Sequence, residues 1–198
     1  MRRAIHHLKS ADPVMADLIQ RAGPFRMNYD RPTFEALAQA IVYQQLNGKA
    51  AATIWGRLVD AAGGEVTPDS ILKLTPQRLR KCGLSRQKLS YIRDLAKKTR
   101  SGEVQFTSLP TRSDEEVIVH LTRVKGIGVW SAQMFLMFAL KRRDVLPTTD
   151  YGILSAVRKA YGIKKLPKAR TVTRLAEKWR PYRSVACWYL WRSLDVRT

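Results

Sequence analysis

Cysteine is scarce in this chain of 198 residues, in which only Cys82 and Cys187 occur. Neither has a CxxC or Cys/His spacing, and the histidines His6, His7 and His120 add no ligand cluster. A disulfide framework, a zinc site and an iron–sulfur cluster are therefore not indicated, and the two cysteines fit a reducing compartment. We expect neither a metal nor a cofactor.

Acidic residues are also few, with 16 Asp and Glu against 36 Lys and Arg, a formal net charge of +20 and a pI near 10.5. A basic surface can serve solubility alone. An excess of this size on a chain of ordinary hydrophobicity is more typical of a protein that binds a phosphate backbone. The composition therefore indicates a nucleic acid partner.

Long apolar runs are absent from the first thirteen residues, MRRAIHHLKSADP, which predict neither a signal peptide nor a membrane span. No basic amphipathic helix stands apart from the core pattern, so we expect no membrane partner. We expect the protein in the cytoplasm, associated with the nucleoid, if its source is bacterial, and in the nucleus if its source is eukaryotic.

Strands of alternating polarity joined by hairpin turns are absent as well, so the chain is predicted to be all-α. A capping side chain precedes an apolar periodic run at four places, which are expected helix starts: Asp12-Pro13, Thr67-Pro68, Thr75-Pro76 and Ser85. The helix after Ser85 is expected to be basic on its outer face. Residues 101–112, polar and containing proline, are the most plausible linker.

Asn47-Gly48 is the one turn signal in a longer helical pattern that begins near Phe34. It fits a break between two helices, which would expose Gln44, Gln45, Leu46 and Asn47 at a tip, and it fits equally a weak spot in one helix. The residues alone leave these two alternatives open.

A glycine turn between two apolar helical runs, VKGIG at residues 124–128, carries the first functional signal. Gly126 and Gly128 are expected to take backbone angles that other residues avoid, and the turn exposes successive N–H groups just where the next helix begins. This geometry binds a phosphate without a side chain. A tight corner with glycines for packing is the alternative, but the charge of +20 favours phosphate.

Asp150 carries the second signal, because it follows Pro147-Thr148-Thr149 and precedes the apolar run of the next helix. It is predicted to be an N-cap. A helix N-terminus stabilises an ionised carboxylate, and a permanent negative charge facing a cleft suits a reaction that builds positive charge on a sugar. The two interpretations are compatible.

Several segments together resemble the helix-hairpin-helix superfamily of DNA glycosylases, and most closely its AlkA-like 3-methyladenine DNA glycosylase II group. They are VKGIGVWSAQ, LPTTDYGI, IVYQQLNGKAA, CGLSRQKLSYIRDLA and WRPYRSVACWYLW, and they cover most of the chain from residue 32 to residue 194. Members of this superfamily carry a hairpin and, about twenty residues on, an essential aspartate. Asp150 follows Gly128 at about that interval.

The resemblance implies a two-lobed, all-α helix-hairpin-helix glycosylase fold without the amino-terminal β domain of longer relatives. The whole chain would be one catalytic unit, with a wedge-bearing lobe at residues 32–112. The other lobe, residues 113–198 plus the N-terminal helix, would carry the hairpin and the aspartate. We expect a monomer that acts on double-stranded DNA containing damaged bases.

The same resemblance implies roles for particular residues. Asp150 would be catalytic, and Trp130, Met134, Tyr151 and Trp191 would bind the substrate base. Gln45 falls at the wedge that fills the gap left by a flipped nucleotide, with Leu46 as the alternative, and Asn47 falls where a residue probes the minor groove. The other expected DNA-binding residues are Lys49, Val124, Lys125, Gly126, Ile127, Gly128 and Ser131.

Two departures from the superfamily pattern bear on the reaction. Lyases of the superfamily have a lysine where this chain has Trp130, so no strand cleavage through a Schiff base is expected. Some alkyl-base members have a tyrosine one helical turn further on, where this chain has Met134, which leaves the range of substrates open. The ranking of N3-methyladenine, N7-methylguanine, 1-methyladenine and hypoxanthine stays open too.

The implied function is the hydrolysis of the N-glycosidic bond of alkylated purines, which leaves an abasic site. Alkylation at N3 of adenine or N7 of guanine makes the base cationic, so aromatic side chains attract it by about 0.5 to 2 kcal/mol per contact. Asp150 would stabilise the oxocarbenium-like sugar and orient or deprotonate water. A non-catalytic DNA-binding module, and a glycosylase for other damaged bases, are the rival interpretations.

Overall fold

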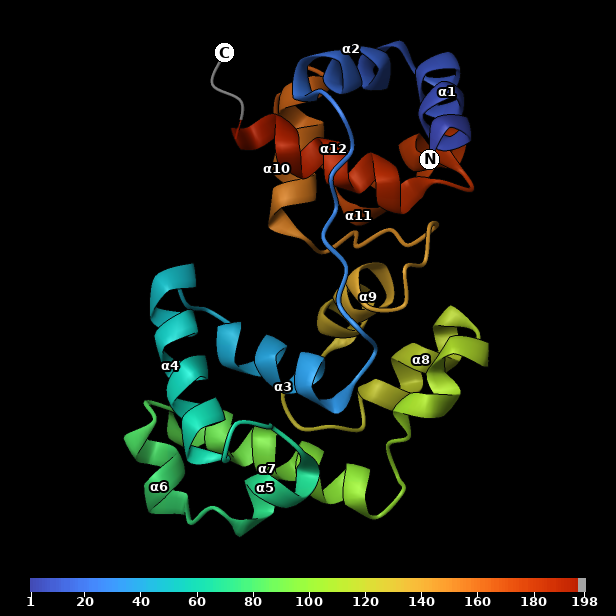
Figure 1. The fold of residues 1–198 in the computed structure, drawn as a ribbon. Coiled ribbons are helices and arrows are strands. Elements are labelled where there is room, and N and C mark those ends of the chain that lie inside the picture. The colour runs from blue at the N-terminus through green and yellow to red at the C-terminus, as the bar shows by residue number, and fades with distance from the viewer. Residues whose placement is uncertain (196–198) are drawn as a thin grey trace. The chain divides into compact units, whose positions relative to one another are not determined.

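A computed structural model describes residues 1–195 of the chain (Figure 1). Over those residues every regular element is an α-helix or a short 3-10 helix, and none is a strand, which confirms the all-α prediction. No helix in the described part is long and apolar enough to cross a bilayer. Contacts divide the chain into residues 30–140, here called the hairpin unit, and residues 1–29 with 141–198, here called the terminal unit.

This division differs from the lobes expected from sequence, because residues 113–140, including the hairpin, group with residues 30–112 and not with Asp150. The linker expected at residues 101–112 is also wrong. This stretch contains the 3-10 helix η1 (Phe106–Thr111), and Val104 and Leu109 are completely buried. The backbone N–H of Gln105 donates to Nε2 of the buried His120 at 3.0 Å, which ties the stretch to α8 (Asp114–Leu121).

The hairpin unit is built around α7 (Arg86–Arg100), whose apolar residues Ile92, Leu95 and Ala96 are all fully buried. This helix packs against three others, α3 (Phe34–Tyr43), α5 (Pro68–Lys73) and α6 (Pro76–Lys81). The predicted caps are present, because Thr67, Thr75 and Ser85 each accept a backbone N–H at the start of the helix that follows. The unit also contains α4 (Gly48–Ala61), and its last helix, α9 (Val129–Phe138), packs on α8.

The terminal unit is built around α12 (Arg183–Asp195), which packs against α2 (Pro13–Ala22) and α10 (Tyr151–Ala160). It also contains α11 (Ala169–Ala176) and the 3-10 helix η2 (Glu177–Trp179). The sequence pattern did not predict the first helix, α1 (Arg2–Ala11), because only Ala4 and Leu8 of its ten residues are buried.

Asp12 links several elements of the terminal unit from a fully buried position. Its Oδ1 accepts the backbone N–H groups of Val14 and Met15, as the predicted N-cap of α2. Its Oδ2 accepts from the Tyr161 hydroxyl, from Trp179 Nε1 at 2.8 Å and from Lys178 Nζ at 3.1 Å. These donors come from α10's C-terminal end and from η2, so one carboxylate fastens three elements.

Asp12→Asn is expected to lower the free energy of unfolding by about 3 kcal/mol, the low end for breaking a buried ion pair, since Lys178 is 41% exposed and partly screened. Burial acts to raise the pKa of Asp12, but hydrogen bonds from Tyr161, Trp179 and Lys178 outweigh it and leave that pKa below its ordinary value. The carboxylate therefore stabilises the fold above the unfolded-state pKa, and this stabilisation is lost as pH falls through the folded pKa.

Urea unfolding at pH 7 and at stepwise lower pH measures both effects. The variant should lose less stability than the wild type on acidification. Asp17→Asn is the matched control on α2, because its carboxylate is 60% exposed in a surface pair with Arg21, and it should change stability by less than about 0.5 kcal/mol. Equal losses in the two variants would show that the Asp12 contacts contribute no special stability.

Candidate active site and DNA-binding elements

The predicted hairpin connects α8 to α9 within the hairpin unit. Val124 and Ile127 are buried, and Ile127 N donates to Val124 O at 3.1 Å, while Lys125 and both glycines are exposed. Gly126 has a φ of +79°, and a Cβ there would overlap the ring of Tyr91. Glycine is therefore required at residue 126 for both its backbone angle and its close packing.

Gly128 differs from the expectation, because its φ of −93° and ψ of 177° are extended angles that any residue adopts. It is the N-cap of α9 and has no side chain to bond the first N–H groups of that helix. The positive end of the α9 dipole and the exposed Lys125 therefore lie on the same turn, and the partly exposed Ser131 lies in the first turn of the helix. This arrangement can bind an anion such as a phosphate.

The helical pattern around Asn47-Gly48 is broken into two helices, because α3 ends at Tyr43 and α4 begins at Gly48. The segment between them is called the tip. Gln45, Leu46 and Asn47 are exposed there, and Gln45 has a φ of +56°. Asn47 Oδ1 accepts the N–H of Ala50 at 2.9 Å, so the side chain predicted to probe the minor groove also caps α4. Lys49, in the first turn of α4, is exposed.

A cavity of about 690 Å³ lies within the hairpin unit. Its lining includes Tyr43, Gln45, Lys88, Trp130, Ser131 and Met134. Trp130 is 43% exposed and Met134 is partly buried, so neither belongs to the closed core. Cavities of this size hold drug-sized ligands in other proteins. Five lining residues were predicted from sequence, namely Gln45, Gly126, Trp130, Ser131 and Met134, and the space that they surround is large enough for a purine.

Asp150 lies in the terminal unit as the N-cap of α10, which confirms that prediction. Its Oδ1 accepts the N–H of Ile153 at 2.8 Å and the indole Nε1–H of Trp191 at 2.8 Å. A Cβ on Gly152 would lie 3.0 Å from Asp150 Oδ1 and 3.0 Å from Trp191 Cδ1, so glycine allows the indole to approach the carboxylate. Tyr151, next in sequence, is 72% exposed.

The carboxylate also influences the buried Cys187 electrostatically. Burial raises the pKa of the Cys187 thiol, and the negative charge of Asp150 raises it further. Trp191 and Arg192 line a second cavity, of about 600 Å³, within the terminal unit.

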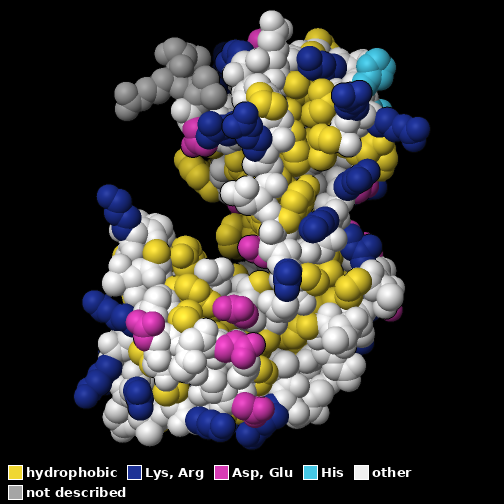
Figure 2. Space-filling model, viewed as in Figure 1, with side chains coloured by type: hydrophobic (Ala, Val, Ile, Leu, Met, Phe, Trp, Pro, Cys, Tyr) yellow, Lys and Arg dark blue, Asp and Glu magenta, His cyan; other side chains and the backbone are white. Residues whose placement is uncertain are grey.

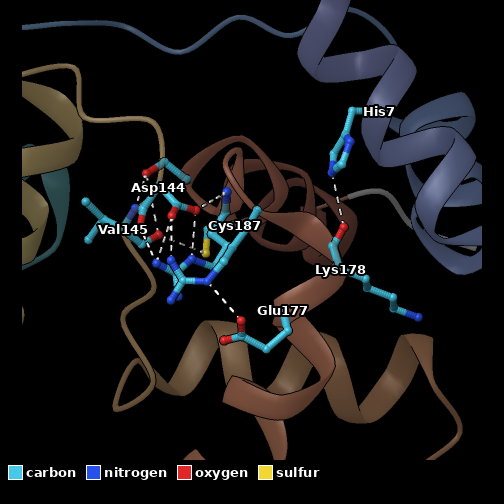
Figure 3. A network of polar contacts seen from close by, with 9 residues as sticks. His7, Asp144, Val145, Glu177, Lys178 and Cys187 are labelled. Carbon is cyan, nitrogen blue, oxygen red and sulfur yellow. Dashed lines mark hydrogen bonds and ion pairs between the residues drawn. The ribbon is translucent and has the colours of Figure 1, made fainter.

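The segment that leads to Asp150 is fixed to the start of α12 by a polar network around Asp144 (Figure 3). Arg183 Nε donates to Asp144 Oδ1 at 2.8 Å, and Arg180 Nη1 donates to Oδ2 at 3.0 Å. Ser184 Oγ accepts the N–H of Val145 at 2.9 Å. Trp191, which bonds Asp150, is also on α12. This helix therefore holds both ends of residues 144–150, the segment that leads to the carboxylate.

The basic outer face expected for α7 is only partly present. Lys88, Arg93 and Lys98 are partly buried and donate to backbone carbonyl groups of the hairpin unit, whereas Lys97 and Arg100 are exposed. On the face that Figure 2 shows, lysine and arginine side chains are spread over both units. Net charge alone therefore did not locate a DNA surface.

Residues 1–195 contain no group of three or more His, Cys, Asp or Glu side chains that could hold a metal ion. Gly152 and Lys88 are two residues of the site that sequence reasoning did not single out. Gly152 follows an N-cap aspartate closely, in the helix's first turn, where glycine is unusual, and that was the available signal. Lys88 had no local signal.

The glycine hairpin between α8 and α9 is a helix-hairpin-helix element, and it is followed along the chain by an aspartate that caps the next helix. Residues 38–181 match the family model described as "HhH-GPD superfamily base excision DNA repair protein". The chain belongs to this family.

Relatives of this chain include 3-methyladenine DNA glycosylases. The chain is 33% identical to DNA-3-methyladenine glycosylase 1 of Schizosaccharomyces pombe, over 98% of this chain and 87% of that protein. A solved structure of the S. pombe 3-methyladenine DNA glycosylase in complex with abasic DNA superposes with a TM-score of 0.87 at 33% identity, covering 98% of this chain and 97% of that one. A DNA-3-methyladenine glycosidase from Bacillus halodurans superposes with a TM-score of 0.87 at 34% identity, over 96% and 88%.

Proposed function

We propose that this protein is a DNA repair glycosylase that hydrolyses the N-glycosidic bond of alkylated purines in duplex DNA and leaves an abasic site. The observation that carries the proposal is the position of Asp150, which caps α10 while Trp191 Nε1 donates to it at 2.8 Å. A carboxylate beside an aromatic ring, in a family of base excision repair proteins, suits a reaction at a sugar that bears a cationic base.

The hairpin and the tip between α3 and α4 are the elements that bind DNA in this proposal. The N–H groups at the start of α9, together with Lys125, bind a phosphate. Gln45 fills the space that the flipped nucleotide leaves, with Leu46, exposed at the same tip between α3 and α4, as the alternative. A base inside a duplex must leave the stack before any carboxylate reaches its sugar.

The positive charge of an alkylated purine explains how the base would be bound and released. A purine methylated at N3 or N7 is positively charged, so an aromatic ring such as that of Trp191, whose indole donates to Asp150, attracts it by about 0.5 to 2 kcal/mol. The charged base is a good leaving group, and the sugar gains positive charge as the bond breaks. Asp150 stabilises that charge and directs water to the sugar carbon, as carboxylates do in glycoside hydrolysis. The products are a free base and an abasic site.

Release of N3-methyladenine and N7-methylguanine from alkylated duplex DNA tests this function directly. The purified full chain is expected to release methylated purines and to leave undamaged bases in place. Binding to DNA without any base release would instead fit a non-catalytic DNA-binding module. Release of oxidised or deaminated bases alone would place the activity on another substrate class. We also propose that a monomer is the active form, which light scattering with the DNA bound will test.

Reaction with borohydride is expected to leave no covalent adduct between this protein and abasic DNA. Trp130 has no amine to form a Schiff base, and water is the proposed nucleophile. Electrophoresis after reduction with borohydride measures the adduct, and a lyase of the superfamily serves as the positive control. A trapped adduct would contradict the monofunctional assignment, and Lys88, which lines the same cavity as Trp130, would then be the first lysine to replace.

A further inference from the structure

One face of α7 contacts both DNA-binding elements of the hairpin unit. Lys88, Tyr91, Asp94 and Lys98 follow one another at intervals of three or four residues, so they form a single stripe along the helix. All four are partly buried and point toward the tip or the hairpin, not toward solvent.

At one end of the stripe, Lys88 binds the C-terminus of α3. Its Nζ donates to the carbonyl oxygens of Val42 at 2.7 Å and of Gln44 at 2.6 Å. The last carbonyls of a helix lack partners within the helix and carry the negative end of its dipole, so an ammonium group suits this place. Partial burial lowers the pKa of Lys88. The residue that follows Gln44 is Gln45, whose φ of +56° is costly for a side chain that is not glycine.

Further along the stripe, three side chains hold the hairpin. The ring of Tyr91 lies against Gly126, and Asp94 Oδ2 accepts the N–H of Lys125 at 2.9 Å. Lys98 donates to the carbonyl of Arg123, and its Nζ lies 3.4 Å from Asp94 Oδ2. The hairpin is therefore fixed to α7 by its backbone and by packing against the glycine.

A direct bond closes the connection between the tip and the hairpin. Gln44 Nε2 donates to the carbonyl oxygen of Gly126 at 3.0 Å. Gln44 thus touches the hairpin with its side chain while its own carbonyl is held by Lys88. Gln44 and Gly126 are 82 residues apart in the sequence, yet the tip and the hairpin to which they belong both contact the same face of α7.

We propose that the α7 stripe (Lys88, Tyr91, Asp94 and Lys98) sets the distance between the hairpin and the tip, and that Lys88 is a positioning residue for Gln45. The inference rests on the proposed function. A strained residue persists only where its surroundings over-determine it. The hairpin binds the DNA backbone. A tip held at a fixed distance from the hairpin can then insert between stacked bases and displace one nucleotide, whereas a mobile tip would be displaced by the stacked bases instead.

Lys88→Met is the test variant, since methionine retains much of the apolar stem and removes the donor. Lys97→Met is the matched control, because it makes the same change of charge on the same helix at an exposed position. On duplex DNA containing one N7-methylguanine, Lys88→Met should slow base release in a single turnover by about tenfold. This is the loss expected when the hydrogen bonds from the charged Lys88 ammonium, which hold the tip in place, are removed. Both variants should weaken binding to abasic duplex DNA equally and slightly.

Two readouts separate positioning from a merely structural role. When the methylated guanine lies opposite a missing base, extrusion costs little, and the defect of Lys88→Met should shrink to less than about twofold. The double variant Gln45→Ala with Lys88→Met should release base no more slowly than Gln45→Ala alone, because Lys88 acts through Gln45. Lys88→Arg retains donors for both carbonyls and should restore most of the rate.

Fluorescence of a 2-aminopurine placed beside an abasic analogue reports unstacking by the tip without any base release. Lys88→Met should reduce the signal that the wild type produces, while Lys97→Met should not. If the wild type releases no methylated purine, the proposed function fails and this fluorescence still decides the inference.

The inference is overturned if Lys88→Met matches Lys97→Met in both assays. It is also overturned if its defect is equal on both substrates and adds to that of Gln45→Ala. Thermal melting checks the fold, and if Lys88→Met does not fold, Gln44→Ala, which removes the side-chain bond to Gly126, must give the same pattern of substrate dependence.

Discussion

Asp150→Asn is expected to retain DNA affinity and to slow base release by about a hundredfold or more. Asparagine keeps an oxygen that can accept from Ile153 N–H and from Trp191 Nε1, the two donors now 2.8 Å from Asp150 Oδ1, so the local structure should survive. What disappears is the negative charge that stabilises the oxocarbenium-like sugar. Single-turnover release of N7-methylguanine measures the rate, and fluorescence anisotropy on abasic duplex DNA measures affinity.

Asp69→Asn is the matched control for this change, because Asp69 is an exposed residue in the first turn of α5, in the hairpin unit, and the substitution alters the net charge equally. It should leave the release rate within about twofold of the wild type. Release by Asp150→Asn at a near-normal rate would refute the catalytic assignment. A parallel fall in affinity and rate would instead point to a DNA-binding role for this carboxylate.

Gly126→Ala should be the most damaging substitution in the hairpin. Alanine is strained at a φ of +79°, and its Cβ would overlap the ring of Tyr91, so the turn and α7 must move apart. We expect the free energy of unfolding to fall by about 3 kcal/mol from strain and overpacking together. Affinity for duplex DNA should fall at least about tenfold, because the N–H groups of the turn would no longer converge on a phosphate.

Gly56→Ala provides the control, since Gly56 lies in the interior of α4 and a Cβ added to it would meet nothing within 4 Å. Alanine is the better helix former there, so stability should rise by up to about 1 kcal/mol with DNA affinity unchanged. Urea unfolding and anisotropy titrations measure both variants. Normal affinity in Gly126→Ala would show that the hairpin does not bind the backbone through its turn.

Local sequence was sufficient to predict several helix starts. The capping residues Asp12, Thr67, Thr75, Ser85 and Ser113 each bond a backbone N–H two or three residues ahead, so neighbouring residues alone decide where the helix begins. The N-cap position of Asp150 was predictable for the same reason.

Features that depend on distant partners were not predictable in this way. Residues 101–112 read as a polar linker because their few apolar residues carry no period, yet Val104 and Leu109 fill the core of the hairpin unit. The lysines of α7 read as a solvated face, yet Lys88 and Lys98 meet carbonyls of other segments. Periodicity reports that a face is polar and not what that face touches.

The sequence by itself determined the helical class of this protein and the capped starts of several helices. It also indicated a polyanionic partner and marked the glycine hairpin and Asp150 as the two functional signals. It did so because caps, glycine angles and net charge act within a few residues or over the whole chain. Only the tertiary structure brought Trp191 to Asp150 across 41 residues, and Lys88 to Gln44 across 44. Such contacts depend on how helices pack, and no local pattern encodes that arrangement.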